Sequence, residues 1–419
     1  MKPQYKVPSM KEVAKVKGTN GYKMVSTFSG CGGSCLGFEM AGFDVVFASE
    51  FVEEARKVYA LNHPGVPIDE KDIRNLTPED ILKATGLKVG ELDILEGSPP
   101  CASFSTAGKR EEGWGKIKGY SDTQQRSDDL FFEYARILKG LQPKLFVAEN
   151  VAGLIKGSAK GYFKQIIREL KSCGYRVEAR VLNAMWLGVP QMRSRLIFIG
   201  VREDLDIPHL WPEPLPYKYS IRDACPWITN DHAITKANFG KNEGNGFIKH
   251  KMNEPAGTVT TRDIGGKSQM ILIKDSSVSI GNEDWFDHLK SLGHPECDEV
   301  EYHFCGIEQF AIGREWLRVK QGQASKKYFN LVRSDAEKPS SAITASSGIS
   351  RSLAGVTHPS EARKFTIPEL KRICAFPDDF ILTGAYQKRW ERLGRSVPPL
   401  MMKSIAIKLE EMLNGINNG

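Results

Sequence analysis

Residues 24–40 combine an apolar run, a glycine-rich turn and a helix-forming segment, and this order constrains the fold more than any other part of the sequence. We expect a strand over 24–28, a turn at Ser29-Gly30-Cys31-Gly32-Gly33 and a helix over 34–40. In α/β proteins such a turn brings a ligand against the backbone N–H groups at the start of a helix. A purely structural interpretation stays open, because tight turns need glycine in any case.

The next units continue the alternation of strand and helix. Residues 45–49 are expected to form a second strand, with Glu50 and Phe51 at its tip. An acidic residue about twenty residues after the glycine turn can accept hydrogen bonds from a ribose diol. The Phe51 ring offers a flat face to a purine, and Asp72 and Ile73 supply a carboxylate and an apolar contact in a third unit.

The next apolar run, Leu92-Asp93-Ile94-Leu95, is short enough to be one buried strand, and a loop with two adjacent prolines follows it. The loop is Gly97-Ser98-Pro99-Pro100-Cys101-Ala102-Ser103-Phe104-Ser105, and its prolines forbid both a helix and continued strand pairing. The thiol of Cys101 is therefore presented on a rigid loop, as a nucleophile would be. The alternative is a small buried cysteine in a proline-rich turn.

Charged residues recur beyond this loop. Residues 108–119 lack periodicity and are expected to form a mobile flap. A buried strand over 144–148 ends at Glu149, which is either a helix cap or an acid in the same cleft as Cys101.

Arg193 and Arg195 alternate along an extended segment, so both side chains point to one side of it. That side is solvated surface unless an anion lies there.

The remaining elements are placed by their hydrophobic periodicity. Residues 1–22 are polar and read as a loose lead-in. The pattern predicts the following elements: helices over 127–141 (capped at Ser127), 161–173 and 367–374, a pair of strands over 177–182 and 195–201, and a final helix that ends near Leu413. From Asp206 the α/β alternation stops and short strands follow. We expect a catalytic domain over 1–205, completed by 390–419, and a second domain over 206–389.

Bulk properties narrow the class of protein. The chain has 419 residues and a formal net charge of +7, which permits nucleic-acid binding without proving it. Its eight cysteines are scattered without a Cys-x-x-Cys pair, which argues for a reducing cytoplasm and against zinc sites or disulfides. No apolar run reaches membrane length and the first residues do not open a signal peptide.

Together these features resemble the cytosine-5 DNA methyltransferase family over nearly the whole chain. The matching motifs stand in the family's order: Phe28 to Gly33, Pro100-Cys101, Glu149-Asn150-Val151, Gln191-x-Arg193-x-Arg195, Arg363 to Phe380, and Gly394-x-Ser396-Val397. The resemblance implies a Rossmann-like S-adenosylmethionine-binding domain with a mixed, mostly parallel sheet. It also implies an irregular, β-rich target-recognition domain.

The resemblance also implies roles for individual residues. The catalytic set is Cys101, Glu149, Arg193 and Arg195. The set expected to bind S-adenosylmethionine is Phe28, Ser29, Gly30, Cys31, Gly32, Gly33, Glu50, Phe51, Asp72, Ile73, Pro100, Leu130, Ser396 and Val397. The set expected to contact double-stranded DNA is Ser105, Gln191, Thr344, Ser346 and Ser347, and no metal is expected.

The chemistry of cytosine explains why such a set is needed. Carbon 5 is too electron-poor to accept a methyl group unaided, and a thiolate that adds at carbon 6 makes carbon 5 enamine-like. A carboxyl at N3, here Glu149, neutralises the charge that this addition pushes onto the ring. Arg193 and Arg195 can then bind the base carbonyl or a backbone phosphate. The base must be flipped out of the duplex for this chemistry.

Two residues depart from the family pattern and keep other interpretations open. Ala102 stands where the family usually has Gln, and Arg395 stands where it usually has Asn. A catalytically silent DNA-binding homologue and an RNA cytosine-5 methyltransferase are therefore the alternatives to a sequence-specific DNA enzyme. For the DNA enzyme we expect a cytoplasmic monomer that shares its recognition site with a restriction endonuclease without forming a stable complex with it.

Overall fold

The computed structural model describes residues 2–100, 118–120, 123–125, 129–228, 273–274, 278–279, 305–328, 330–348, 350 and 352–417. Cys101, Ala102, Ser105, Ser127 and most of the expected flap lie outside the described residues, so the predictions about them stay predictions. Two short hairpins of the described part, β5 (Lys118–Tyr120) with β6 (Thr123–Gln125) and β11 (Ile273–Lys274) with β12 (Val278–Ser279), are antiparallel.

A seven-stranded sheet forms the centre of the larger lobe, with strand order β3-β2-β1-β4-β7-β10-β8. Its strands are β1 (Lys23–Thr27), β2 (Asp44–Ser49), β3 (Ile68–Asp69), β4 (Ile94–Gly97), β7 (Leu145–Val151), β8 (Tyr175–Asn183) and β10 (Ser194–Arg202). The first five in the spatial order are parallel, and β10 runs antiparallel to both β7 and β8. The predicted α/β fold with a mixed, mostly parallel sheet is confirmed.

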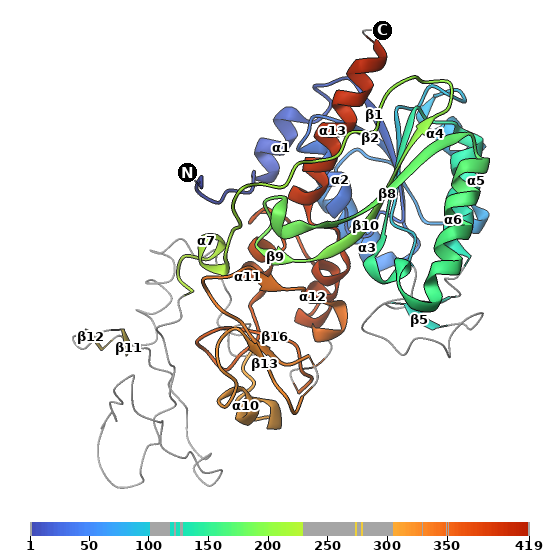
Figure 1. Cartoon of the computed structure of the whole chain (residues 1–419). Helices are drawn as coiled ribbons and strands as arrows, with labels where there is room; N and C mark the ends of the chain where they lie inside the picture. The colour runs from blue at the N-terminus through green and yellow to red at the C-terminus, as the bar shows by residue number, and fades with distance from the viewer. Residues whose placement is uncertain are drawn as a thin grey trace, which may run out of the picture.

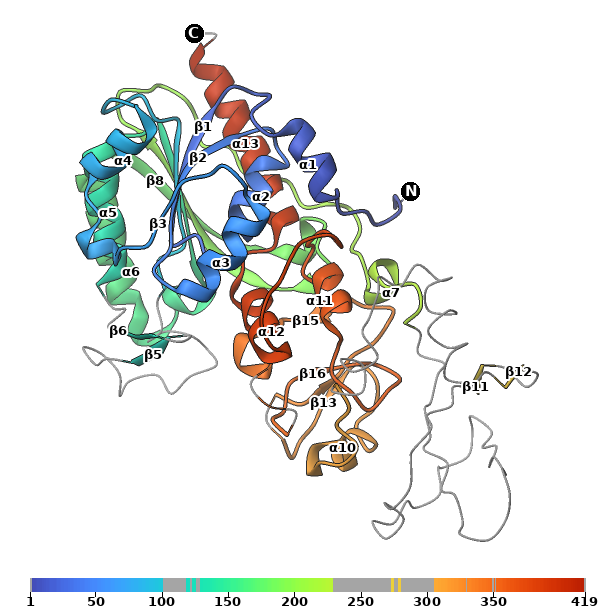
Figure 2. The same ribbon diagram turned by 180° about the vertical axis from the view of Figure 1, so that it is seen from behind.

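Helices cover both faces of this sheet (Figures 1 and 2). On one face lie α2 (Gly33–Glu39), α3 (Glu53–Asn62) and α13 (Pro399–Asn417), and on the other α4 (Pro78–Thr85), α5 (Leu130–Leu141) and α6 (Lys160–Ser172). Neighbouring strand residues join different clusters: Met24 and Ile94 pack with α2 and α13, whereas Val25 and Leu95 pack with α5. This is the consequence of the two-residue period of a strand that is buried on both faces.

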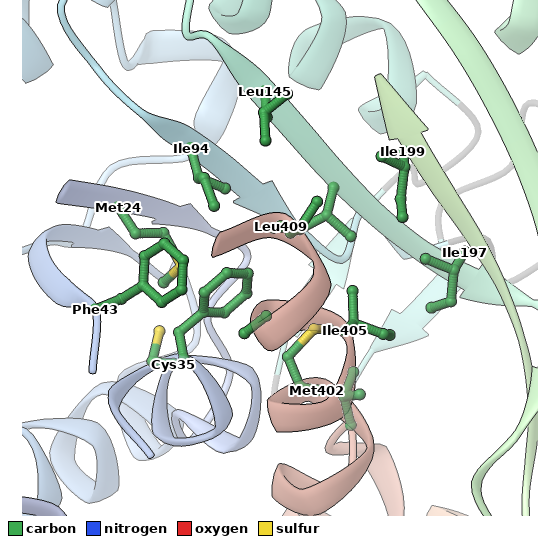
Figure 3. Packing of buried hydrophobic residues seen from close by; sticks show 14 of the residues in the cluster. Met24, Cys35, Phe43, Ile94, Leu145, Ile197, Ile199, Met402, Ile405 and Leu409 are labelled. Atoms are coloured by element: carbon green, nitrogen blue, oxygen red, sulfur yellow. The ribbon is translucent and has the colours of Figure 1, made fainter. Parts of the chain in front are cut away.

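The helix α13 returns from the far end of the chain to pack against α2 and the sheet. Figure 3 shows Met402, Ile405 and Leu409 of this helix in one cluster with Met24, Cys35 and other sheet and α2 side chains. A Cβ atom at Gly37 would lie 2.6 Å from the Pro399 carbonyl oxygen and 2.7 Å from Met402 Cβ. The absence of a side chain at Gly37 therefore allows the two helices to touch.

A smaller lobe follows the sheet and consists of short elements. They are α7 (Ile221–Ala224), α10 (Ala311–Trp316), β13 (Gln323–Ala324), β14 (Val332–Arg333), β15 (Ser340–Ser341), β16 (Val356–Thr357), α11 (Ile367–Ile373) and α12 (Tyr386–Arg395). β15 pairs with β9 (Gln191–Met192), a short strand between β8 and β10 of the larger lobe. Ile307, Ile312, Trp316 and Leu331 form a cluster inside this lobe. A second cluster joins Leu36 and Val58 of the larger lobe to residues such as Phe365, so the two lobes share part of their core.

Three predictions of local structure need correction. The lead-in over 1–22 contains the helix α1 (Met10–Val16), whose first turn is closed by a capping box between Ser9 and Glu12. The fourth strand covers 94–97 instead of 92–95, and α5 begins at Leu130 after Asp129.

Within the described residues, no helix has both the length and the apolar character that crossing a membrane requires.

Packing between β7 and β10 gives a test of the fold. Gly200 is paired with Phe146, and a Cβ atom at residue 200 would lie 1.9 Å from Phe146 Cε1. We expect Gly200→Ala to lower the free energy of unfolding by about 1–3 kcal/mol, because the buried ring must move. The matched control is Gly161→Ala on α6, where no atom lies within 4 Å of the added methyl group. Urea denaturation should show no loss for this control, and an equal loss in both variants would contradict the packing.

Candidate functional site

Three strand ends meet at the edge of the sheet where the strand order reverses. In the register of the sheet, Thr27 of β1 pairs with Gly97 of β4, and Gly97 pairs with Ala148 of β7. The glycine turn after β1, the prolines after β4 and Glu149 on β7 therefore lie side by side. In open α/β sheets, ligands bind in the crevice at this position.

The glycine turn leads tightly from β1 into α2. Phe28, Gly30 and Gly32 all have positive φ, at 54°, 58° and 92°. A Cβ atom at Gly32 would also lie 2.1 Å from Nε2 of the buried His63, so only glycine fits there. The turn thus has the short, side-chain-poor form that lets a ligand approach the backbone.

Glu50 lies directly beside this turn. Its carboxylate accepts hydrogen bonds from the Gly30 N–H at 2.8 Å and the Val52 N–H at 2.7 Å. Burial raises the pKa of Glu50, and the two backbone N–H groups oppose that rise. The neighbouring Phe51 is 39% exposed, so its ring is available for stacking.

The side chains of the third predicted unit, Asp72 and Ile73, already have partners within the protein. The Asp72 carboxylate accepts from the Arg74 backbone N–H and guanidinium, and Arg74 also pairs with Asp129. Ile73 and Leu130 are buried in the cluster between the sheet and α5. Their contact with a cofactor stays a prediction.

Segments from far apart in the sequence complete the turn. Cys31 Sγ lies 2.9 Å from Ser396 Oγ, and a Cβ atom at Gly33 would lie 2.6 Å from the Val397 carbonyl oxygen. Burial raises the pKa of Cys31, while the Ser396 hydroxyl opposes the rise. The structure therefore brings Ser396 and Val397 to the predicted cofactor turn.

Glu149 lies inside β7, which excludes the helix-cap interpretation. Its carboxylate Oε1 forms an ion pair with Arg195 Nε at 2.5 Å. The adjacent Asn150 donates from Nδ2 to the Pro99 carbonyl oxygen at 3.0 Å. The Glu-Asn-Val segment is thus linked to the loop that leads to Cys101.

Arg193 and Arg195 have different partners, although the alternation placed them on one side. Arg193 is buried and donates to three carbonyl oxygens of the smaller lobe or its edge: Ile343 at 3.0 Å, Gly394 at 3.0 Å and Arg395 at 3.2 Å. Burial, and then the charge of Arg195, lowers the pKa of Arg193 to about 9. In this arrangement Arg193 fastens the two lobes together, whereas Arg195 orients Glu149.

The predicted DNA contacts differ in their accessibility. Gln191 is fully buried and donates to Cys374 Sγ at 3.2 Å. Thr344 and Ser347 bond to each other through their hydroxyls at 2.7 Å, and Ser347 is buried. Ser346 is exposed, whereas Thr344 and Ala345 are half-buried, so Ser346 has the most accessible side chain of the 344–347 segment.

Glu96 is a further residue at this sheet edge, and no motif in the sequence singled it out. This residue of β4 is 1% exposed, and it accepts from the hydroxyls of Ser26 (2.6 Å), Ser34 (2.8 Å) and Ser98 (3.3 Å). Burial raises its pKa to about 7, with a further rise from the charge of Glu149, whereas the serine hydroxyls lower it. An acidic residue in an otherwise apolar strand was the signal that could have revealed it.

The raised pKa of Glu96 predicts a pH-dependent stability. Because the folded protein holds this proton more tightly than the unfolded chain, the Glu96 contribution to stability falls as pH rises from 4.5 to about 7. We expect Glu96→Gln to remove this fall. The free energy of unfolding of the variant minus that of the wild type should therefore be about 3 kcal/mol higher at pH 8 than at pH 4.

The control for this prediction is Glu178→Gln, on the edge strand β8. The pKa of Glu178 is lowered, despite partial burial, by its hydrogen bond with Trp211 and by the nearby His209 and Arg180. Its relative stability should therefore change in the opposite direction with pH. Urea denaturation at both pH values measures both variants, and parallel changes would contradict the environment described for Glu96.

The anchoring of Arg193 predicts a large loss of stability on its removal. Arg193→Met leaves three carbonyl oxygens without their donor, and we expect a loss of at least about 2 kcal/mol in the free energy of unfolding. Arg180→Met, at an exposed guanidinium on β8, should cost less than about 0.5 kcal/mol. Thermal denaturation compares the two, and similar melting temperatures would show that Arg193 does not hold the lobes together.

Comparisons with known proteins extend over both lobes. A sequence model of C-5 cytosine-specific DNA methylases matches residues 22–411. The Type II methyltransferase M.NgoPII of Neisseria gonorrhoeae is 28% identical over 404 residues, which cover 94% of this chain and 97% of the relative. M.NgoFVII of the same organism is 30% identical over 384 residues, which cover 91% and 84%.

Solved structures share the fold. A candidate DNA modification methyltransferase encoded within an E. coli prophage superposes with a TM-score of 0.60 at 21% identity, over 94% of this chain and 99% of the other. A mutant of DNMT2 from Spodoptera frugiperda gives a TM-score of 0.57 at 18% identity, over 93% and 99%. At these identities the likeness concerns the fold alone.

Proposed function

The chain belongs to the C-5 cytosine-specific DNA methylase family, and we propose that it transfers a methyl group from S-adenosylmethionine to carbon 5 of a flipped cytosine in a specific duplex DNA sequence. The observation that carries this proposal is the adjacency of three features at one sheet edge. They are the glycine turn, the strand that leads to Cys101, and the Glu149–Arg195 pair. The Type II relatives support a role in restriction and modification.

The residues around the glycine turn fit S-adenosylmethionine. The Glu50 carboxylate at the tip of β2 suits a ribose diol, and the exposed Phe51 ring suits the adenine. Ser396 and Val397 close the turn from the other side. When bound, S-adenosylmethionine supplies an electrophilic methyl group on its sulfonium.

The chain's own residues would prepare the cytosine. The thiolate of Cys101 forms a bond to carbon 6, and electron density moves to carbon 5 and towards N3. Glu149 shares a proton with N3, and Arg195 fixes the orientation of that carboxyl through the 2.5 Å ion pair. After methylation, water takes the carbon-5 proton, the electron pair of that C–H bond forms the double bond between carbons 5 and 6, and the Cys101 sulfur leaves carbon 6 as a thiolate.

We assign DNA recognition to residues 206–389 and the chemistry to 1–205 together with 390–419. The packing of α13 on α2 supports the second part of this division. Trp390 Nε1 of α12 donates to the Thr344 carbonyl oxygen at 2.9 Å, and the buried Lys364 donates to the Ser347 and Ser350 carbonyl oxygens. These bonds fix the backbone at Thr344, Ser347 and Ser350, so that the exposed Ser346 is presented as a candidate base contact.

A transfer assay tests the proposal. Purified protein is mixed with S-adenosylmethionine that carries a labelled methyl group and with mixed-sequence duplex DNA, and the labelled base is identified after hydrolysis. We expect 5-methylcytosine from the wild type and none from Cys101→Ser. Glu149→Gln should be slower by about 10²–10⁴-fold, because the general acid is lost. Cys173→Ser, directly after α6, and Glu178→Gln on β8 are the matched controls and should keep wild-type rates.

Other outcomes would favour the alternatives. Binding of duplex DNA without transfer to any sequence would indicate a silent DNA-binding homologue. Transfer to RNA alone would indicate an RNA methyltransferase. Transfer that persists in Cys101→Ser would overturn the nucleophile assignment.

A further inference from the structure

Glu96 is a buried carboxyl at the centre of the site that the proposed chemistry leaves without a role. It precedes Gly97, which pairs with Thr27 of β1 on one side and Ala148 of β7 on the other. Its side chain therefore lies where the cofactor turn, the nucleophile loop and the Glu149 strand come together.

The hydroxyl groups around Glu96 join the two loops. Ser26 and Ser34 flank the glycine turn on its β1 and α2 sides, and Ser98 begins the loop that leads to Cys101. Ser29, within the turn, donates to Ser26 Oγ at 3.0 Å and extends the network. The carboxyl is thus held beneath the predicted cofactor turn by hydrogen bonds to both of its oxygens.

Among the residues that the structure describes, the hydrogen-bond partners of this carboxyl are all neutral hydroxyls and include no cation. The charge that acts on it most strongly is another carboxylate, Glu149 of β7. Cys35 on α2, Tyr59 on α3 and Tyr134 on α5 also interact with it electrostatically, and none of them carries a positive charge. A buried negative charge that is solvated only by hydroxyls gains from a cation brought into the adjoining crevice.

We propose that Glu96 is a specificity-determining residue that favours the sulfonium form of the cofactor over the neutral thioether that remains after methyl transfer. The inference rests on the proposed function, because it takes the crevice to be the S-adenosylmethionine site. Methyl transfer removes the positive charge from the bound molecule, and the ionised Glu96 then no longer attracts it. Release of S-adenosylhomocysteine in exchange for S-adenosylmethionine is favoured as a result.

The test measures the binding of both molecules to the full-length protein by calorimetry between pH 6 and pH 8.5. The ionisation of Glu96 near pH 7 makes the preference depend on pH. We expect the ratio of the dissociation constant of S-adenosylhomocysteine to that of S-adenosylmethionine to rise about fivefold over this range in the wild type. In Glu96→Gln the ratio should stay constant. The α-amino group is common to the two ligands, so its own titration largely cancels in the ratio.

Two further variants distinguish the effect of the Glu96 charge from the effect of its hydrogen bonds. Ser98→Ala removes one hydrogen bond but keeps the carboxyl, so the ratio should still rise with pH. Glu149→Gln removes the charge that helps to raise the pKa of Glu96, so the midpoint of the rise should move to lower pH. This midpoint shift decides the question if Glu96→Gln fails to fold.

The outcomes distinguish this inference from the proposed function. A wild-type protein that binds both ligands with a pH-independent ratio overturns the inference alone. A rise that persists in Glu96→Gln, or a midpoint that does not move in Glu149→Gln, also overturns it. A wild-type protein that binds neither ligand overturns the proposed function and this inference with it.

Discussion

The contact between the glycine turn and the C-terminal segment is the constraint on which the rest of the structure depends. Gly33 and Gly37 have no side chains, and so the Val397 and Pro399 carbonyl oxygens come within reach of α2. This contact places α13 on the sheet and leaves Ser396 beside Cys31. The same segment is continuous with α12, whose end provides the carbonyl groups that Arg193 holds. The predicted cofactor site and the joint between the lobes therefore share one piece of chain.

Along the strand ends, similar side chains differ in role because their surroundings differ. Arg193 and Arg195 are two residues apart, yet one is surrounded by backbone carbonyl groups and the other faces a carboxylate. Glu96 and Glu149 sit on neighbouring strands, but in the described part of the chain Glu96 accepts hydrogen bonds from hydroxyl groups, whereas Glu149 has a guanidinium partner. Pairs of ionisable groups with such unequal environments are typical of sites that perform acid–base chemistry.

The sequence was most informative where structure is decided locally. The glycine turn, the tip of β2 at Glu50, and the paired strands β8 and β10 follow from periodicity and turn residues. The partners of Arg193 could not be predicted, because they lie 150 residues or more along the chain. Burial of Gln191 against Cys374 has the same cause. The helix α1 was overlooked for another reason: it is only seven residues long and depends on its capping box more than on an apolar face.

The way in which Arg193 joins the lobes bears on how such a protein can diversify. Its acceptors at Ile343 and Arg395 are main-chain carbonyl oxygens, which every amino acid possesses. The joint therefore places no demand on the side-chain chemistry at those two positions. Substitutions can accumulate around it, and change what the smaller lobe contacts, without altering how that lobe is attached. A lineage built on this plan can acquire new contact surfaces while its chemical centre stays as it was.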